Sequence, residues 1–173
     1  MVIRHTAFAE VQQRIKQCFA LSATKAGGEG LAIAGKSGTG KTCVLKSFQS
    51  NHRPTRGPDG AEIPVLYISV PAKPTVKSHA GAMLAALGEP DWERGTENEK
   101  LRRLSILMRI AGTRVMMLDE FQHLYDQGKR QIKFNVVDWI KFLIDETCST
   151  LVVAGLPSCR ASSMRTSNWP GAS

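Results

Sequence analysis

The sequence predicts an α/β fold in which a parallel β-sheet lies between two layers of helices. Three observations predict it. Short apolar runs have the length of buried strands, and segments with helical spacing of apolar residues separate them. A glycine-rich run joins the first of these strands to the next helix. Since strands that alternate with helices form a parallel sheet with helices on both faces, the order indicates a three-layer α/β domain. The predicted strands are residues 30–34, 64–70, 114–120 and 151–154.

The helices follow from apolar spacing and from their end signals. Apolar residues recur at helical intervals from Ala7 to Ser22, and a glycine-rich link over residues 26–30 follows. Thr96 with Glu99 three residues later forms a capping-box pattern that starts a helix ending at Gly112. Prolines and glycines predict a loop over residues 51–64 and a connection over residues 89–95. The other predicted helices are residues 43–50, a segment that begins within 73–78 and ends at Gly88, and residues 138–146.

The glycine-rich run from Gly35 to Thr42 fits the pattern G-x-x-x-x-G-K-[ST] of a P-loop. Glycines let the backbone curl so that successive N–H groups point at phosphate oxygens, and the helix N-terminus adds its positive dipole end. Lys41 would reach the β- and γ-phosphates of ATP, and the Thr42 hydroxyl would hold Mg²⁺. The residues expected to bind the nucleotide are Gly35, Lys36, Ser37, Gly38, Thr39, Gly40, Lys41, Thr42 and Cys43.

A second acidic motif completes the expected site. The apolar strand that ends near residue 118 is followed by Asp119 and Glu120, and a parallel sheet brings this end to the same edge as the P-loop. Asp119 would lie near Mg²⁺, and Glu120 would orient and deprotonate the attacking water, so Glu120 and Lys41 are the expected catalytic residues. An acidic strand end is also a common solvated feature, and only the upstream P-loop makes the pattern specific. Ser158 is the one polar residue near the tip of the last strand, and Arg160 and Arg165 are arginine-finger candidates.

Bulk properties restrict the partners. The chain has 173 residues and a net charge of +8, which favours a polyanion such as nucleic acid over a neutral ligand. Aromatic residues make up only 6%, so contact with a phosphate backbone is expected more than stacking on bases. The absence of an 18-residue apolar stretch and of a signal-peptide layout predicts a cytoplasmic protein without a membrane span. Four scattered cysteines are expected to be reduced thiols.

Three segments together resemble the TniB-type transposition helper ATPases of the AAA+ superfamily: Gly35–Thr42, Leu118–Leu124 and Leu151–Pro157. The resemblance implies an ATP-dependent protein that forms a homo-oligomer on double-stranded DNA and recruits or activates a partner transposase. It divides the chain into an N-terminal helix and linker (1–28), an AAA+ core (29–160) and a tail (161–173). By position, basic loops along the DNA backbone would include Lys73, Lys77, Lys129, Arg130 and Lys133.

The tail departs from the family pattern. Family members continue into a helix with an arginine finger and a small helical lid, whereas residues 161–173 have no helical period and are expected to be disordered. One choice of codons for Ser162–Ser173, read in a shifted frame, encodes a family-like continuation. This is the basis of a hypothesis that a frameshift near Ala161 truncated the chain. Without the finger and the lid we expect weak ATP binding and slow hydrolysis.

Alternative functions stay open at this point. A helicase loader or replication-initiation ATPase would share the P-loop, the acidic strand end and the basic charge. A nucleotide-gated binding module with little catalysis, or an ATPase that regulates only protein partners, would also fit these motifs. Preference for duplex over single-stranded DNA, turnover with DNA, and sensitivity to salt distinguish them.

Overall fold

A four-stranded parallel sheet forms the centre of the molecule. Its strands lie in the order β1–β8–β5–β4, so the two central strands are far apart in sequence from their neighbours. This confirms the predicted parallel sheet. The strands are β1 (Gly30–Ala34), β4 (Val65–Ser69), β5 (Val115–Asp119) and β8 (Thr150–Gly155). The computed structural model describes residues 6–22, 30–58, 60–72, 74–126, 131–132 and 134–157.

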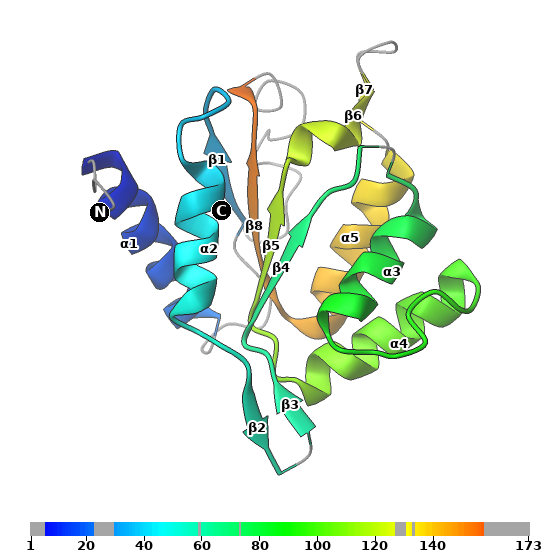
Figure 1. The fold of residues 1–173 in the computed structure, drawn as a ribbon. Helices are drawn as coiled ribbons and strands as arrows, with labels where there is room; N and C mark the ends of the chain where they lie inside the picture. The colour runs from blue at the N-terminus through cyan, green and yellow to red at the C-terminus, as the bar shows by residue number, and fades with distance from the viewer. Residues whose placement is uncertain are drawn as a thin grey trace.

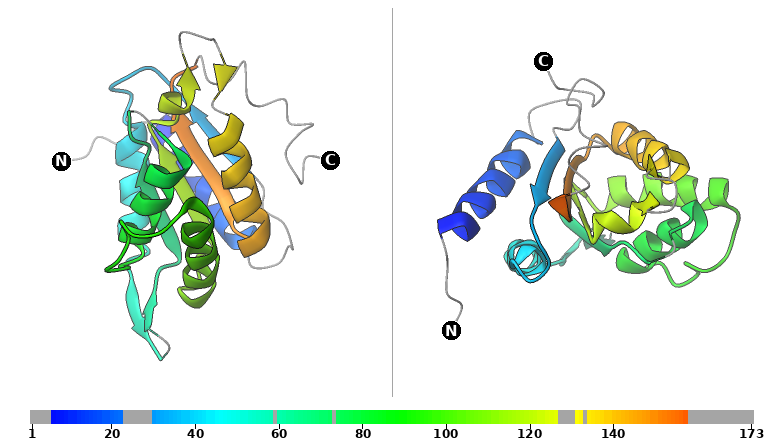
Figure 2. Two further views of the ribbon diagram at one scale, coloured as in Figure 1. Left: turned by 90° about the vertical axis from the view of Figure 1, so that its right-hand side faces the viewer. Right: turned by 90° about the horizontal axis from the view of Figure 1, so that it is seen from above.

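Helices cover both faces of this sheet, as the sequence predicts. Helices α1 (Thr6–Leu21) and α2 (Lys41–Ser50) lie on one face. Helices α3 (Val76–Ala86), α4 (Glu97–Ile110) and α5 (Phe134–Thr147) lie on the other. The three layers are seen separately in the view from above in Figure 2, and the colours of Figure 1 show the order of the elements along the chain.

Each face of the sheet has its own buried apolar cluster. Because successive side chains of a strand point to opposite faces, Met117 packs with α1 and α2, whereas Met116 and Leu118 pack with the other three helices. Every residue of β5 and β8 is buried. A strand that is buried on both faces shows a continuous apolar run without alternation, which is the pattern that these two strands have in the sequence.

The helix ends agree with the capping signals. The Thr96 hydroxyl accepts a hydrogen bond from the Glu99 N–H, and the Glu99 carboxylate accepts one from the Thr96 N–H, so the predicted capping box is present. The hydrogen bonds that the Glu99 carboxylate accepts from the Thr96 N–H and from the Thr96 hydroxyl lower the pKa of Glu99. Helix α5 begins at Phe134, four residues before the predicted start. The reason is that Val136 and Ile140 are buried one turn apart, so the apolar face of the helix starts earlier.

The prediction of a loop over residues 51–64 is wrong in part. This segment contains an antiparallel hairpin of β2 (Thr55–Gly57) and β3 (Gly60–Glu62), at the end of the sheet away from the P-loop. Gly60, with φ +131°, adopts a backbone conformation that L-residues rarely adopt, and it allows the chain to reverse after Gly57. The glycines and prolines therefore predicted the turn correctly, but they did not indicate that the segments on either side of it pair as strands.

Three further short elements follow β5 and were not predicted. They are a 3₁₀ turn η1 (Phe121–Leu124) and two antiparallel segments, β6 (Tyr125–Asp126) and β7 (Gln131–Ile132). The predicted tail 161–173, Ser158, Arg160 and Arg165 lie outside the described residues. Within the part of the chain that the structure describes, no helix combines the length and the apolar character needed to cross a membrane.

Candidate functional site

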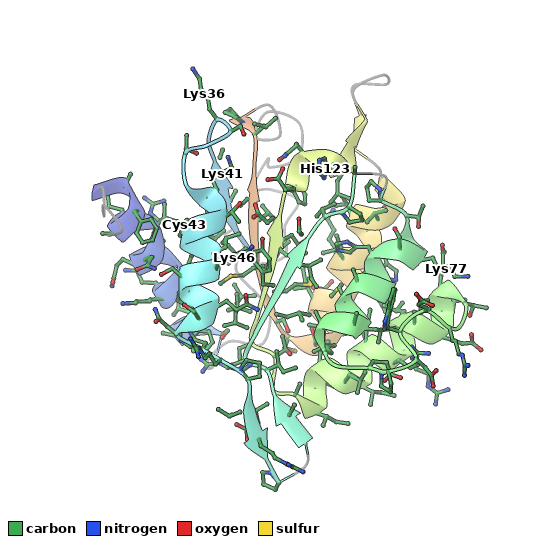
Figure 3. The ribbon with its side chains drawn as sticks, in the orientation of Figure 1. Lys36, Lys41, Cys43, Lys46, Lys77 and His123 are labelled. Carbon is green, nitrogen blue, oxygen red and sulfur yellow. The ribbon has the colours of Figure 1, made fainter. Side chains whose placement is uncertain are left out.

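The site lies at the carboxyl edge of the sheet, where β1 passes through residues 35–40 into α2. Gly38 and Gly40 have φ values of +79° and +85°, and a residue with a side chain would be strained in this left-handed conformation. Helix α2 begins directly at Lys41, so its free N–H groups face the loop. Figure 3 shows Lys36 at the top of this loop and Lys41 below it, with His123 across the end of the sheet and Cys43 on α2 on the side of α1.

The side chain of Lys41, the first residue of α2, reaches back to the centre of the loop. Its ammonium group donates hydrogen bonds to the carbonyl oxygens of Gly35 and Lys36, both at 2.8 Å. The Thr39 hydroxyl also donates to the Lys36 carbonyl, at 2.8 Å. A Cβ atom at Gly35 would come within 2.8 Å of the Thr39 oxygen, so only glycine fits there without a shift. The loop thus curls around the ammonium group of Lys41.

Asp119 connects this loop to the end of β5. It is almost fully buried, and its Oδ2 accepts hydrogen bonds from the Thr42 hydroxyl at 2.6 Å and from the Tyr67 hydroxyl at 2.9 Å. Burial, and then the hydrogen bond to Asp119, raise the pKa of Tyr67 above its ordinary value, so the phenol keeps its proton as a donor. Thr42 and Asp119 therefore meet as the sequence predicts, and Tyr67 on β4 is a partner that the sequence analysis missed.

This oxygen pair fits Mg²⁺. Magnesium prefers oxygen ligands and is usually held by one or two protein groups together with substrate phosphates and waters. Thr42 and Asp119 supply such oxygens beside the P-loop. No group of three or more His, Cys, Asp or Glu side chains among the described residues could hold a metal ion. A cation here would thus depend on phosphate oxygens for the rest of its ligands.

Glu120 turns away from the strand and toward the loop. Its φ of +55° is left-handed, which is uncommon for a residue other than glycine. Its N–H donates to the Asp119 Oδ1 at 2.9 Å, and its carboxylate accepts a hydrogen bond from the Gln122 side-chain amide. Glu120 and Gln122 line a cavity of about 490 Å³ together with Lys41, Thr42 and Leu156. The predicted base thus faces the predicted phosphate-binding residues.

A second cavity, of about 580 Å³, lies on the other side of the P-loop. Phe8 and Val11 of α1 and Ile33 of β1 form much of its wall, and Val44 and Cys43 of α2 complete it beside Gly40 and Lys41. An apolar cavity next to a phosphate-binding loop suits a flat heteroaromatic base. The role of α1 in this wall was not predicted. Its apolar spacing indicated only that one side of the helix is buried.

Of the five expected DNA-contact residues, the structure describes only Lys77. Lys77 is exposed on α3, and Figure 3 shows it on the opposite flank of the molecule from Lys41. Lys73, Lys129, Arg130 and Lys133 lie outside the described residues.

Solved structures of other proteins share the fold of this chain. The chain is similar to Cdc6p from Pyrobaculum aerophilum, with a TM-score of 0.66 and 18% identity over 96% of this chain and 43% of that protein. It is also similar to the Aeropyrum pernix Orc1 protein, solved in complex with DNA, with a TM-score of 0.64 and 18% identity over 95% of this chain and 42% of that one. The chain thus spans less than half the length of either protein.

Sequence comparison identifies the family. A search of curated protein sequences gives no match to this chain. The model of the family described as "Bacterial TniB protein" matches residues 1–167, which includes the P-loop, the acidic strand end and all of the described sheet. The chain therefore belongs to the TniB family, and it has the fold of the AAA+ P-loop ATPases.

Proposed function

We propose that this protein is an ATP-binding and ATP-hydrolysing helper of DNA transposition that assembles on double-stranded DNA and recruits or activates a partner transposase. The observation that carries the proposal is the convergence of Lys41, Thr42, Asp119 and Glu120 at one edge of the sheet in a chain of the TniB family. The convergence supports nucleotide chemistry, and the family supports its use in transposition.

Each residue of the site has a chemical task in this proposal. The P-loop N–H groups would bind phosphate oxygens, and Lys41 would exchange its carbonyl partners for the β- and γ-phosphates. Thr42 and Asp119 would hold Mg²⁺, which neutralises charge on the phosphates. Glu120 would take a proton from the attacking water. The adenine base would occupy the cavity lined by Phe8.

The DNA contact rests on charge and on the family. A net charge of +8 attracts a phosphate backbone, and the chain between β6 and β7 contains Lys129 and Arg130. With Lys73, Lys77 and Lys133 these residues are the proposed contacts to duplex DNA. A homo-oligomer along the duplex would place many such contacts in register and would offer a repeated surface to the transposase.

Binding of the chain to a labelled random-sequence duplex, measured with ATP, with ADP and without nucleotide across a salt series, tests the proposal. We expect binding that requires ATP, weakens steeply with salt and is lost in Lys41→Ala. Lys16→Ala is the matched control, because Lys16 is exposed on α1 and does not line either cavity. It should keep ATP-dependent binding.

Other outcomes would point to the alternative functions. Preference for single-stranded DNA would favour a helicase loader or replication-initiation ATPase. ATP-dependent binding without turnover in the presence of DNA would favour a nucleotide-gated binding module. Binding that ignores nucleotide would contradict the proposal altogether.

A further inference from the structure

We propose that Gln122 is a positioning residue that orients the carboxylate of Glu120 for hydrolysis and links it to the end of β8. The inference rests on the proposed function, because it assigns a positioning residue to the proposed base. Gln122 belongs to η1, directly after the acidic strand end, and it lines the same cavity as Glu120, Lys41 and Thr42. Its side chain has two ends with different surroundings, and these surroundings define its task.

The nitrogen end of the Gln122 amide holds Glu120. Its Nε2 donates a hydrogen bond to the Glu120 Oε2. A carboxylate that must accept a proton from water needs one oxygen in a fixed direction and the other free. The backbone of Glu120 is fixed by its left-handed φ of +55° and by two hydrogen bonds, from its N–H to Asp119 and from the His123 N–H to its carbonyl. Gln122 adds the constraint on the side chain.

The oxygen end of the same amide lies against β8. Gln122 Oε1 is buried and has no hydrogen-bond partner among the described residues. A Cβ built at Gly155, the last residue of β8, would lie 3.2 Å from this oxygen and 3.3 Å from the Gln122 backbone nitrogen. The Gly155 carbonyl accepts a hydrogen bond from the Gly35 N–H at 3.1 Å. Gln122 therefore lies between the proposed base and the residue that ties β8 to the start of the P-loop.

The unpaired oxygen separates a positioning role from a purely structural one. Leaving a buried acceptor without a partner costs free energy, so an apolar side chain of similar size should be no worse for folding at this position. If the amide were rotated, its oxygen would face the Glu120 carboxylate. This orientation is unfavourable because both groups carry negative charge at their oxygens. A glutamine in this position is thus explained by its bond to Glu120 and not by the packing around it.

Turnover and nucleotide affinity of Gln122→Met, which keeps the length but removes the amide, test the role. We expect kcat for DNA-stimulated ATP hydrolysis to fall by about tenfold or more, with ATP affinity within about twofold of wild type. The free energy of unfolding should be equal or higher. Gln13→Met, at an exposed position of α1, is the matched control and should leave all three unchanged. An unchanged kcat, or a parallel loss of ATP affinity, would overturn the assignment.

Gly155→Ala tests the link to β8. The added methyl group would press on Gln122 and on the Phe121 Cβ, which also lies 3.3 Å away. We expect a smaller fall in kcat than in Gln122→Met, and the double variant should be no slower than Gln122→Met alone. Additive losses in the double variant would show that Gly155 acts through another route, and the link would be wrong.

A measurement without hydrolysis separates this inference from the proposed function. The side-chain amide signals of Gln122 in a ¹⁵N NMR spectrum should shift in Glu120→Ala. The signals of Gln12, whose amide donates to the Ser47 hydroxyl at 3.0 Å, are the internal reference and should stay in place. If Gln122 does not respond, the contact is wrong whatever the activity. If it responds but wild type never hydrolyses ATP, the proposed hydrolysis fails and the catalytic purpose of the contact fails with it.

Discussion

Asp119 is a buried carboxylate with a hydrogen-bond donor on each oxygen. Oδ2 accepts from the hydroxyls of Thr42 and Tyr67, and Oδ1 accepts from the Glu120 N–H. A charge taken out of water is tolerated only when such donors replace its hydration. The three bonds therefore replace hydrogen bonds to water that the side chain loses on burial, and they fix its orientation relative to the P-loop.

The first prediction concerns the donor from β4. Tyr67→Phe keeps the ring and removes one donor from the charged oxygen, and hydrogen bonds to charged groups contribute about 1.5–3 kcal/mol each. We expect the free energy of unfolding, measured by urea denaturation, to fall by about that amount. Ser50→Ala is the control, because its exposed hydroxyl donates to the Ser47 carbonyl, and it should cost less than about 0.5 kcal/mol. Equal effects of the two changes would contradict the role given to Tyr67.

Some site residues could be predicted from sequence and others could not. Lys41, Thr42, Asp119 and Glu120 belong to short contiguous motifs whose spacing reflects their chemistry. Tyr67 reaches the site because β4 pairs beside β5, with Ser69 opposite Asp119, and no local pattern gives the order of strands in a sheet. Gln122 was within the family-like segment, but only the structure shows that its amide bonds to Glu120.

Helices α3 and α5 meet at a buried histidine. His79 has no exposed surface, its two ring nitrogens lack hydrogen-bond partners among the described residues, and its ring contacts the Trp139 ring edge-on at 6.2 Å between centroids. Burial lowers the pKa of His79 to about 4. The folded protein thus keeps this imidazole neutral where the unfolded chain would protonate it.

The sign of the pH effect follows from that difference. Between the ordinary pKa of about 6.5 and the folded value of about 4, the unfolded state binds one proton more, so stability falls as the pH is lowered through this range. The loss from His79 would approach about 3 kcal/mol at the acid end. We expect His79→Leu to flatten the fall in the free energy of unfolding between pH 6.5 and pH 4. Parallel pH profiles for the variant and wild type would contradict this.

Helix α1 gives a prediction about nucleotide specificity. Phe8 lines the apolar cavity beside the P-loop, and aromatic stacking on a base contributes about 1–3 kcal/mol. We expect Phe8→Ala to weaken ATP binding by about tenfold and to leave inorganic tripolyphosphate binding unchanged. Leu21→Ala, at an exposed position of the same helix, should affect neither. A loss of tripolyphosphate binding would mean that Phe8 supports the loop and not the base.

At the level of elements, strands that are buried on both faces were the easiest to predict. Two features limited the prediction elsewhere. The β2–β3 hairpin is exposed on nearly all of its residues, so it has no apolar period, and its existence depends on backbone pairing across a glycine turn. The short β6 and β7 segments have only two residues each, which is below the length at which periodicity can be detected.

The molecule as a whole should respond to nucleotide as one unit. The P-loop joins β1 to α2, Asp119 joins β5 to Thr42, and α1 forms a wall of the neighbouring cavity. At an ATP–Mg²⁺ concentration one hundredfold above Kd, binding stabilises a protein by about 2.7 kcal/mol. We expect Tm to rise by roughly 5–10 °C for a domain of this size. The same nucleotide should leave Lys41→Ala unchanged, and an equal shift in both proteins would place nucleotide binding elsewhere.

The two hydroxyl groups that share one oxygen of Asp119 also bear on the order in which ligands arrive. A magnesium ion that came alone would meet two protein side-chain oxygens, both already engaged, and would have to give up tightly held water for little return. An ion already bound to a triphosphate would bring phosphate oxygens as ligands, and Thr42 and Asp119 would supply the protein oxygens. We therefore expect the protein to bind free magnesium weakly and to bind the metal as its complex with ATP. The concentration of ATP in the cell, and not that of magnesium, would then determine when the site is filled.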